Sequence, residues 1–243
     1  MEPRIDEIAD RIWRISTYIP DVSPEGFTFN QFVLDGEEPL LYHTGMRSLF
    51  PLVSAAVDRV VGLDRLRWIA FSHLEADESG AMNEFLAAAP NSQIAHSPTG
   101  VMLSIADQAA RPPHTWLPDQ PLDIGGRLLS RKVQVLETPH VPHNWEAQVV
   151  FEETTGTLFC GDLGTQIGDG PAVTTDTLRE RAATAETMFH QLSSPQASAE
   201  VLHRLAELEP RTLAVMHGSS FTGDGAAELR SLAEAYAGLV AAV

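Results

Sequence analysis

The run His73-Leu74-Glu75-Ala76-Asp77-Glu78 places four side chains that can bind metal within six residues. It follows an apolar stretch at 66–71 that is typical of a buried strand, and it precedes a stretch at 82–87 that is typical of a helix. Side chains two residues apart in an extended segment share one side, so positions 73, 75 and 77 can direct donors at one point. Charged groups at the end of a buried strand are costly unless they are paired or metal-bound. The run therefore indicates a metal site.

Other histidines and carboxylates occupy the same kind of position, just after a predicted strand and often beside glycine or proline. They are His140 and His143 after a strand at 133–137, Asp162 after one at 157–160, and His217 after one at 212–216. Loops at strand ends are where a sheet displays reactive side chains. A histidine and carboxylate set of this size suits a site for two metal ions, in which Asp162 is the candidate bridge.

Each of these signals alone has an ordinary structural explanation. Gly161-Asp162 after a strand is typical of a turn. Acidic residues such as Asp77 and Glu78 are favoured at the N-terminus of a helix by its dipole. A single histidine such as His140 is commonly a core residue that is hydrogen-bonded to the backbone. The occurrence of all these signals together, in order and at strand ends, favours the metal site.

The order of the predicted elements indicates two β-rich halves with helices on the outside. Predicted strands lie at 12–15, 26–34, 39–45, 66–72, 93–95, 122–127, 133–137, 147–151, 157–160 and 212–216, and 114–121 is expected to be a loop. Predicted helices lie at 49–61, 79–89, 101–109, 177–192, 198–208 and 226–242. Because no repeat or long linker separates the halves, we expect one domain over residues 1–243.

Composition limits the class of protein. The chain has 243 residues, 44% of them hydrophobic, so a sizeable core is expected. The formal net charge of −17 argues against nucleic acid and anionic membranes as partners, because both need basic patches. The single cysteine, Cys160, excludes an intrachain disulfide and favours a reducing compartment. The sequence has neither a signal peptide nor an apolar run of membrane-spanning length, so we expect a cytoplasmic protein.

In motif order, the whole chain resembles the metallo-β-lactamase superfamily. The resemblance rests on the run at 73–78, on Thr138-Pro139-His140, on Gly161-Asp162 after a hairpin, and on a late His217-Gly218. It implies an α/β fold, an αββα sandwich of two mixed β-sheets with helices on the outer faces. The hydrolases of the superfamily have the motif H-x-H-x-D-H, in which this chain has Glu75 in place of the second histidine. The pattern H-x-E-x-D resembles the flavodiiron proteins and the related oxygen-binding di-iron proteins.

Carried over residue by residue, the resemblance implies two metal positions. The ligands of the first would be His73, Glu75, His143 and the bridging Asp162; those of the second would be Asp77, Asp162 and His217, with Glu78 as a further candidate. His143 is preferred to His140 because it lies nineteen residues before Asp162, a spacing that resembles that of the di-iron family. His140 is the alternative ligand, and Asp77 and Glu78 are also the candidate catalytic residues.

Two positions depart from the family pattern. Position 78 is Glu where the family usually has His, so that Glu78 either binds the second ion as a carboxylate or points away from it. The superfamily tends to have Asp in the segment at 42–45, where this chain has His43. His43 either supports the ligand loop in place of that Asp or is a packed histidine.

Replacement of imidazole by carboxylate makes the site harder and favours iron or manganese over zinc. We therefore expect two metal ions, iron first and zinc or manganese as alternatives. The leading hypothesis is a non-haem di-iron, oxidoreductase-like protein that binds or reduces dioxygen or nitric oxide. Phe27, Phe29 and Trp145 either wall its pocket or, as is more common for such residues, are ordinary core aromatics. The alternative is a hydrolase that uses a metal-bridging hydroxide on an ester, thioester, lactone or phosphodiester, with Asp77 orienting the water.

The resemblance also implies partners. Flavodiiron proteins carry a flavodoxin domain after the metal domain, and because this chain ends at Val243 we expect no flavin-binding domain. A reductase would then take its electrons from an external donor or a neighbouring subunit, whereas a sensor would need no fast donor. The expected ligand is a diatomic gas or a small-molecule substrate, and a homodimer is compatible with the sequence.

Overall fold

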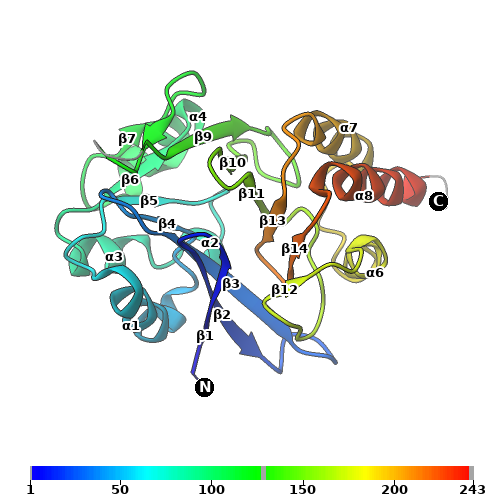
Figure 1. Ribbon diagram of the computed structural model, residues 1–243, viewed down its shortest axis with the longest axis horizontal. Helices are drawn as coiled ribbons and strands as arrows, with labels where there is room; N and C mark the ends of the chain where they lie inside the picture. Colours follow the sequence, from blue (N-terminus) through cyan, green and yellow to red (C-terminus); the bar gives the residue numbers. More distant parts are fainter. Residues whose placement is uncertain (1, 127–129, 241–243) are drawn as a thin grey trace.

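Two seven-stranded mixed β-sheets pack face to face (Figure 1). The computed structural model describes residues 2–126 and 130–240. The first sheet contains, in spatial order, β1 (Arg4–Ala9), β2 (Ile12–Ile19), β3 (Phe27–Leu34), β4 (Leu40–Tyr42), β5 (Trp68–Ala70), β6 (Gln93–His96) and β7 (His114–Thr115). The second contains β12 (Val173–Thr174), β14 (Ser220–Thr222), β13 (Thr212–Val215), β11 (Thr157–Gly161), β10 (Gln148–Glu152), β9 (Lys132–Glu137) and β8 (Leu122–Asp123).

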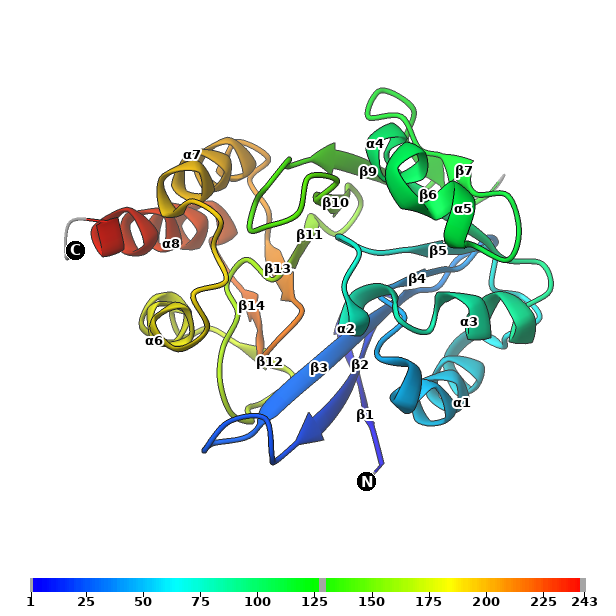
Figure 2. The ribbon, with the colours of Figure 1, turned by 180° about the vertical axis from the view of Figure 1, so that it is seen from behind.

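Helices cover the outer face of each sheet, and Figure 2 shows the two groups on opposite sides of the sandwich. The first half of the chain supplies η1 (Arg47–Leu49), α1 (Phe50–Val61), α2 (Ala76–Ser79), α3 (Met82–Ala88), α4 (Pro98–Gly100), η2 (Val101–Ile105) and α5 (Ala106–Gln108). The second half supplies α6 (Arg179–Phe189), α7 (Pro195–Ala206) and α8 (Gly225–Val240). The expected αββα sandwich of two mixed sheets is confirmed. Within the described ranges, no helix combines the length and the apolar character needed to cross a membrane.

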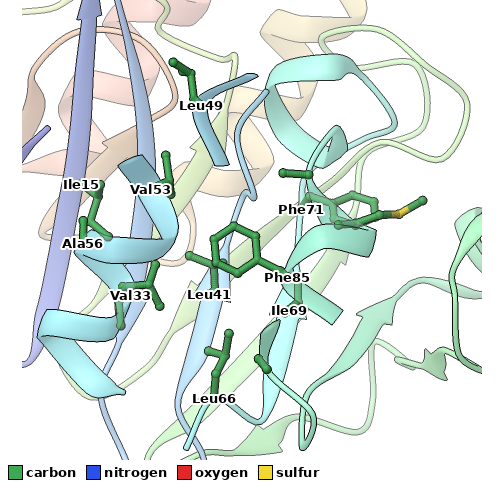
Figure 3. Packing of buried hydrophobic residues seen from close by; sticks show 14 of the residues in the cluster. Ile15, Val33, Leu41, Leu49, Val53, Ala56, Leu66, Ile69, Phe71 and Phe85 are labelled. Atoms are coloured by element: carbon green, nitrogen blue, oxygen red, sulfur yellow. The ribbon is translucent and has the colours of Figure 1, made fainter. Parts of the chain in front are cut away.

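Alternation along the strands divides the apolar side chains between an inner core and two outer cores. Successive side chains of a strand point to opposite faces, so Leu41 faces α1 and α3 while its neighbours Leu40 and Tyr42 face the second sheet. Figure 3 shows Leu41 and Phe85 of α3 within the outer core of the first sheet. Between the sheets, the ring centroids of Tyr42 and Phe159 lie 5.3 Å apart. The central strands are therefore buried on both faces, which fixes the positions of their ends.

The expected helix at 79–89 is in fact two helices, α2 and α3, and α2 begins three residues before the predicted start. Tertiary hydrogen bonds explain the break between them. The amide of Ala81 donates to the carbonyl of Gly45 at 3.0 Å, and the amide of Thr44 donates to the carbonyl of Glu78 at 2.7 Å. The segment after β4 thus takes hydrogen bonds that a continuous helix would have made within itself.

Several short or polar elements were missed by the sequence analysis. The edge strand β1 pairs only with β2 among the described strands, and its sequence Arg4-Ile5-Asp6-Glu7-Ile8-Ala9 lacks a continuous apolar face. Strands β7, β12 and β14 have two or three residues each, too few to show a periodic pattern. Residue 127 of the predicted strand at 122–127 and residues 241 and 242 of the last predicted helix lie outside the described residues.

A buried ion pair closes the turn between β10 and β11, and we expect its contribution to stability to depend on pH. Glu152 is fully buried, lies 3.3 Å from Nε of Arg131, and accepts hydrogen bonds from the amides of Thr154 and Thr155. Burial opposes ionisation, but the hydrogen bonds from Thr155 outweigh it and hold the pKa of Glu152 below its usual 4.5. Loss of charge-assisted hydrogen bonds in Glu152→Gln should cost about 1–2 kcal/mol at neutral pH.

Because the folded pKa of Glu152 is depressed, this stabilisation is present above the unfolded pKa and is lost as the pH falls through the folded value. Urea unfolding of the wild type and of Glu152→Gln at pH 7 and below pH 4.5 should therefore show a difference that shrinks in acid. The exposed neighbour Glu153, changed to Gln, is the matched control. An equal difference at every pH would contradict the assigned role of the ion pair.

Candidate metal centre

The seven predicted ligands follow strands of both sheets and lie close together, and five of them line one hollow. His73 and Glu75 follow β5, Asp77 and Glu78 lie in α2, His143 lies between β9 and β10, Asp162 follows β11, and His217 follows β13. The hollow has a volume of about 500 Å³ and is open to solvent; its walls include Phe27, Glu75, Asp77, His143, Asn144, Asp162, Phe189, Gln191 and His217. The seven side chains fall into two clusters in space.

The first cluster consists of His73, Glu75, His143 and Asp162, and one donor atom of each lies within 4.8 Å of the others. Nε2 of His73 lies 3.2 Å from Oε2 of Glu75 and 3.6 Å from Oδ2 of Asp162. Nε2 of His143 lies 3.0 Å and 3.5 Å from the same two oxygens. Two imidazole nitrogens and two carboxylate oxygens therefore face one point.

The second cluster consists of Asp77, Glu78 and His217. Nε2 of His217 lies 3.3 Å from Oδ2 of Asp77 and 3.3 Å from Oδ1 of Asp162. Asp162 therefore directs Oδ2 at the first cluster and Oδ1 at the second. One carboxylate spans the two clusters, which is the geometry expected of a bridging ligand.

Each candidate histidine ligand has a hydrogen-bond partner at Nδ1, on the side of the ring that faces away from the clusters. The partner is a backbone carbonyl for His143 and His217 and the Ser72 hydroxyl for His73. Nδ1 of His217 donates to the carbonyl of Thr28 at 2.8 Å, and Nδ1 of His143 donates to the carbonyl of Gln191 at 2.9 Å. A carbonyl only accepts, so these Nδ1 atoms carry the hydrogen and each neutral ring has its lone pair on Nε2. Nε2 of each ring faces carboxylates, and a cation, either a proton on Nε2 or a metal ion, must lie between them to avoid repulsion.

The electrostatics of the clusters favour such a cation. Burial lowers the pKa of His217, but Asp162 and Asp77 outweigh burial and raise it to about 10. Burial likewise lowers the pKa of His143, but Glu75 and Asp162 raise it to about 9. Hydrogen bonds with His143 and His73 lower the pKa of Glu75 to about 2. The carboxylates thus attract positive charge to the points at which the Nε2 atoms converge.

Glu78 provides the test of whether the donor set suits metal ions. Its side chain is fully buried, and neither oxygen receives a hydrogen bond from residues 2–126 or 130–240. Burial raises the pKa of Glu78 well above 4.5, and the charges of Asp162 and Asp77 raise it further. A buried carboxylate without partners costs several kcal/mol, whereas a cation at the second cluster would satisfy it. The residues present therefore fit a pair of metal ions.

His43 supports the ligand loop through Ser72. Nε2 of His43 lies 3.1 Å from Oγ of Ser72, and that Oγ lies 2.9 Å from Nδ1 of His73. All three side chains are buried, and burial lowers the pKa of His43 to about 3. Of the two roles that the sequence left open for His43, the geometry favours support of the ligand loop.

Of the three aromatic side chains expected to wall the pocket, Phe27 lines the hollow, whereas Phe29 and Trp145 do not. The ring of Phe27 lies 4.2 Å from that of His217, and Phe29 approaches His217 edge-on at 5.2 Å. The expected role of Trp145 is wrong, because its side chain is 54% exposed and points to solvent. Phe189, at the end of α6, lies 5.3 Å from Phe27 and lines the hollow in its place.

Four other residues near the site differ from one another in whether the sequence indicated them and in whether they reach the hollow. His140, the alternative ligand, is exposed and lies outside both clusters. Phe189 and Gln191 were missed, because an apolar residue at a helix end and a backbone carbonyl give no distinctive signal in a sequence. Cys160, two residues from Asp162, faces the outer core beneath α7 and α8 rather than the hollow.

We expect Cys160 to be inert towards thiol reagents in the folded protein. Its side chain is 1% exposed, and burial raises the pKa of the thiol far above its usual 9. Because the thiolate is the reactive form, labelling by a disulfide reagent should be undetectable under native conditions and should reach one thiol per chain in denaturant. Rapid labelling of the native protein would contradict this placement of Cys160.

Comparisons with known proteins identify a family and a shared fold. The family model described as "ODP family beta lactamase" matches residues 27–218. The type A flavoprotein fprA of Rhodobacter capsulatus is 28% identical over 201 residues, which are 79% of this chain and 45% of that protein. The chain spans less than half the length of the curated relatives that it matches.

Solved structures share the fold. The metal-soaked Flv1 flavodiiron core from Synechocystis superposes with a TM-score of 0.82 and 17% identity over 97% of this chain and 61% of that one. Rubredoxin oxygen:oxidoreductase from the anaerobe Desulfovibrio gigas superposes with a TM-score of 0.78 and 19% identity over 96% of this chain and 60% of that one. At these identities the likeness establishes the fold alone.

Proposed function

Because the chain belongs to the ODP family of beta-lactamase-fold proteins, we propose that its two clusters hold a non-haem di-iron centre that binds or reduces dioxygen or nitric oxide. The observation that carries the proposal is Asp162, whose two oxygens face different clusters. Four carboxylates and three histidines form the donor set, and such an oxygen-rich set favours iron or manganese over zinc. When bound, two iron ions supply one-electron redox chemistry at positions open to a small ligand.

The residues of the hollow suit a small apolar ligand. Phe27 and Phe189 form an apolar wall beside His217, on the side of the second cluster. Glu75 is 52% exposed and lies at the solvent side of the first cluster. A diatomic gas can therefore approach between an apolar wall and the open side of the clusters.

A di-iron centre that reduces its ligand needs a source of electrons. The name of the Desulfovibrio gigas protein, rubredoxin oxygen:oxidoreductase, describes oxygen chemistry of that protein. If this chain reduces its ligand, the electrons come from a donor outside residues 1–243; a separate protein and a neighbouring subunit of a homodimer are two candidates. If the chain only binds the ligand, it needs no fast electron donor.

Metal analysis combined with spectroscopy tests the proposal. Protein expressed without a metal-binding tag should contain about two irons per chain, as expected for a carboxylate-rich pair of sites. Its near-ultraviolet absorption should bleach on anaerobic reduction, and nitric oxide should change the spectrum of the reduced protein. Two zinc ions per chain and no colour would contradict the di-iron assignment and would support the hydrolase alternative, to be examined with ester and phosphodiester substrates.

A further inference from the structure

The two clusters differ in chemistry. With Asp162 shared, the first cluster offers two imidazoles and two carboxylates, whereas the second offers His217 and three carboxylates, Asp77, Glu78 and Asp162. We infer that the second cluster selects a harder cation than the first, so that the centre discriminates between its two metal positions. This inference rests on the proposed function, because it concerns the same pair of metal positions.

Glu78 is the residue that makes the clusters unequal. It is fully buried, so its carboxylate has no access to bulk water. Neither of its oxygens receives a hydrogen bond from the described part of the chain. Its Oε2 lies 3.8 Å from Nε2 of His73, which directs the carboxylate into the space between the clusters rather than towards the core. A buried carboxylate so directed is a ligand for whichever cation occupies the second cluster.

His217 contributes a single nitrogen donor, as each histidine of the first cluster does, so the clusters differ in the number of histidines. Its Nδ1 donates to the carbonyl of Thr28, so His217 can offer only Nε2 to a metal. The remaining donors of the second cluster are oxygens, which suit Mn²⁺ and Fe³⁺, whereas imidazole suits Zn²⁺ and Fe²⁺. In the first cluster, His73 and His143 both present Nε2, and their nitrogens lie 2.8 Å apart.

Absolute affinity cannot report this selectivity, because almost any set of nitrogen and oxygen donors binds Zn²⁺ more tightly than Mn²⁺. The informative quantity is the ratio of manganese to zinc in one position compared with the same ratio in the other. The two positions lie in one molecule and share Asp162, so each serves as the reference for its partner.

In the experiment, metal-free protein is loaded with Mn²⁺ in excess over Zn²⁺. The occupancy of each position by each metal is measured by anomalous diffraction at the manganese and zinc absorption edges. The total metal content is measured in solution. The manganese-to-zinc ratio should be about tenfold or more higher in the second position, a difference of about 1.4 kcal/mol. Glu78→His should bring the two ratios together, and Glu78→Gln, which keeps the shape of the side chain, should narrow the difference. Glu75→Gln, the matched change in the first cluster, should leave the ratio in the second position unchanged.

Equal ratios in the wild-type protein would overturn the inference while leaving the dinuclear centre intact. A wild-type difference that persists in both Glu78 variants would also overturn it, since the selectivity would then come from other donors. If the wild type binds neither metal, both the inference and the proposed function fail.

Discussion

Replacement of Asp162 by alanine should leave the chain with no more than one of its two metal ions. Oδ2 of Asp162 faces His73 and His143, and Oδ1 faces His217, so the substitution removes an oxygen donor from both positions. It also removes the negative charge beside Nε2 of His73, His143 and His217, which would balance the charge of a metal ion. Metal content per chain, measured after removal of loosely bound ions, should therefore fall from two towards one or none.

The fold should survive this change, because the backbone of residue 162 keeps its contacts. Its carbonyl accepts hydrogen bonds from Nε2 of Gln191 at 3.1 Å and from the hydroxyl of Thr165 at 2.7 Å. His140→Asn is the matched control, since His140 is exposed, lies outside both clusters, and has a positive φ of 64° that asparagine tolerates. Full occupancy of both positions in the Asp162→Ala protein would show that Asp162 is not the bridge.

The sequence was sufficient to predict which candidate side chains lie together, because most of them follow buried strands. A buried strand has a strong apolar pattern, so the residues that follow it can be located without a structure. His73, Asp162 and His217 each follow such a strand, and the sandwich brings those ends together. No such guide exists for Trp145, because the loop between β9 and β10 has no periodic pattern that would indicate the direction of a side chain.

The contacts that support the ligands could not be predicted, because they connect residues far apart in the chain. The carbonyl of Gln191 orients His143 from a position 48 residues away, and the carbonyl of Thr28 orients His217 from a position 189 residues away. Every residue has a carbonyl, so no residue type marks these partners. Phe189 is a similar case, since it becomes part of the hollow only because α6 ends beside Phe27.

His43, Ser72 and His73 form a hydrogen-bonded relay, and its loss should weaken metal binding. If His73 presents Nε2 to the first cluster, its Nδ1 carries the hydrogen and donates to Oγ of Ser72. The Ser72 hydroxyl is then free to donate to Nε2 of His43, which is neutral because burial lowers its pKa to about 3. The relay fixes both the tautomer and the orientation of His73. Loss of such an outer partner typically weakens metal binding by about 10–100-fold.

Ser72→Ala should therefore weaken metal binding at the first cluster by about 10–100-fold and leave the second cluster close to the wild type. Competition with a coloured chelator, analysed as two binding steps, measures the two affinities. His43→Leu should produce part of the same loss, and His43→Gln, whose amide oxygen can accept from Ser72, should retain more affinity. Both His43 variants experience the same strain at the φ of 67°, so the difference between them reports the acceptor.

The double variant separates a relay from two independent packing effects. If His43 acts on His73 only through the Ser72 hydroxyl, the affinity of Ser72→Ala combined with His43→Leu should equal that of Ser72→Ala alone. Residues that act through one hydrogen-bond network are not additive, whereas independent contacts are. Ser72→Ala keeps the Cβ that packs closely against Gly161, where an added Cβ would lie 2.8 Å away, so the variant removes the hydroxyl and leaves this packing in place. Additive losses, or an unchanged first cluster in Ser72→Ala, would mean that other contacts orient His73.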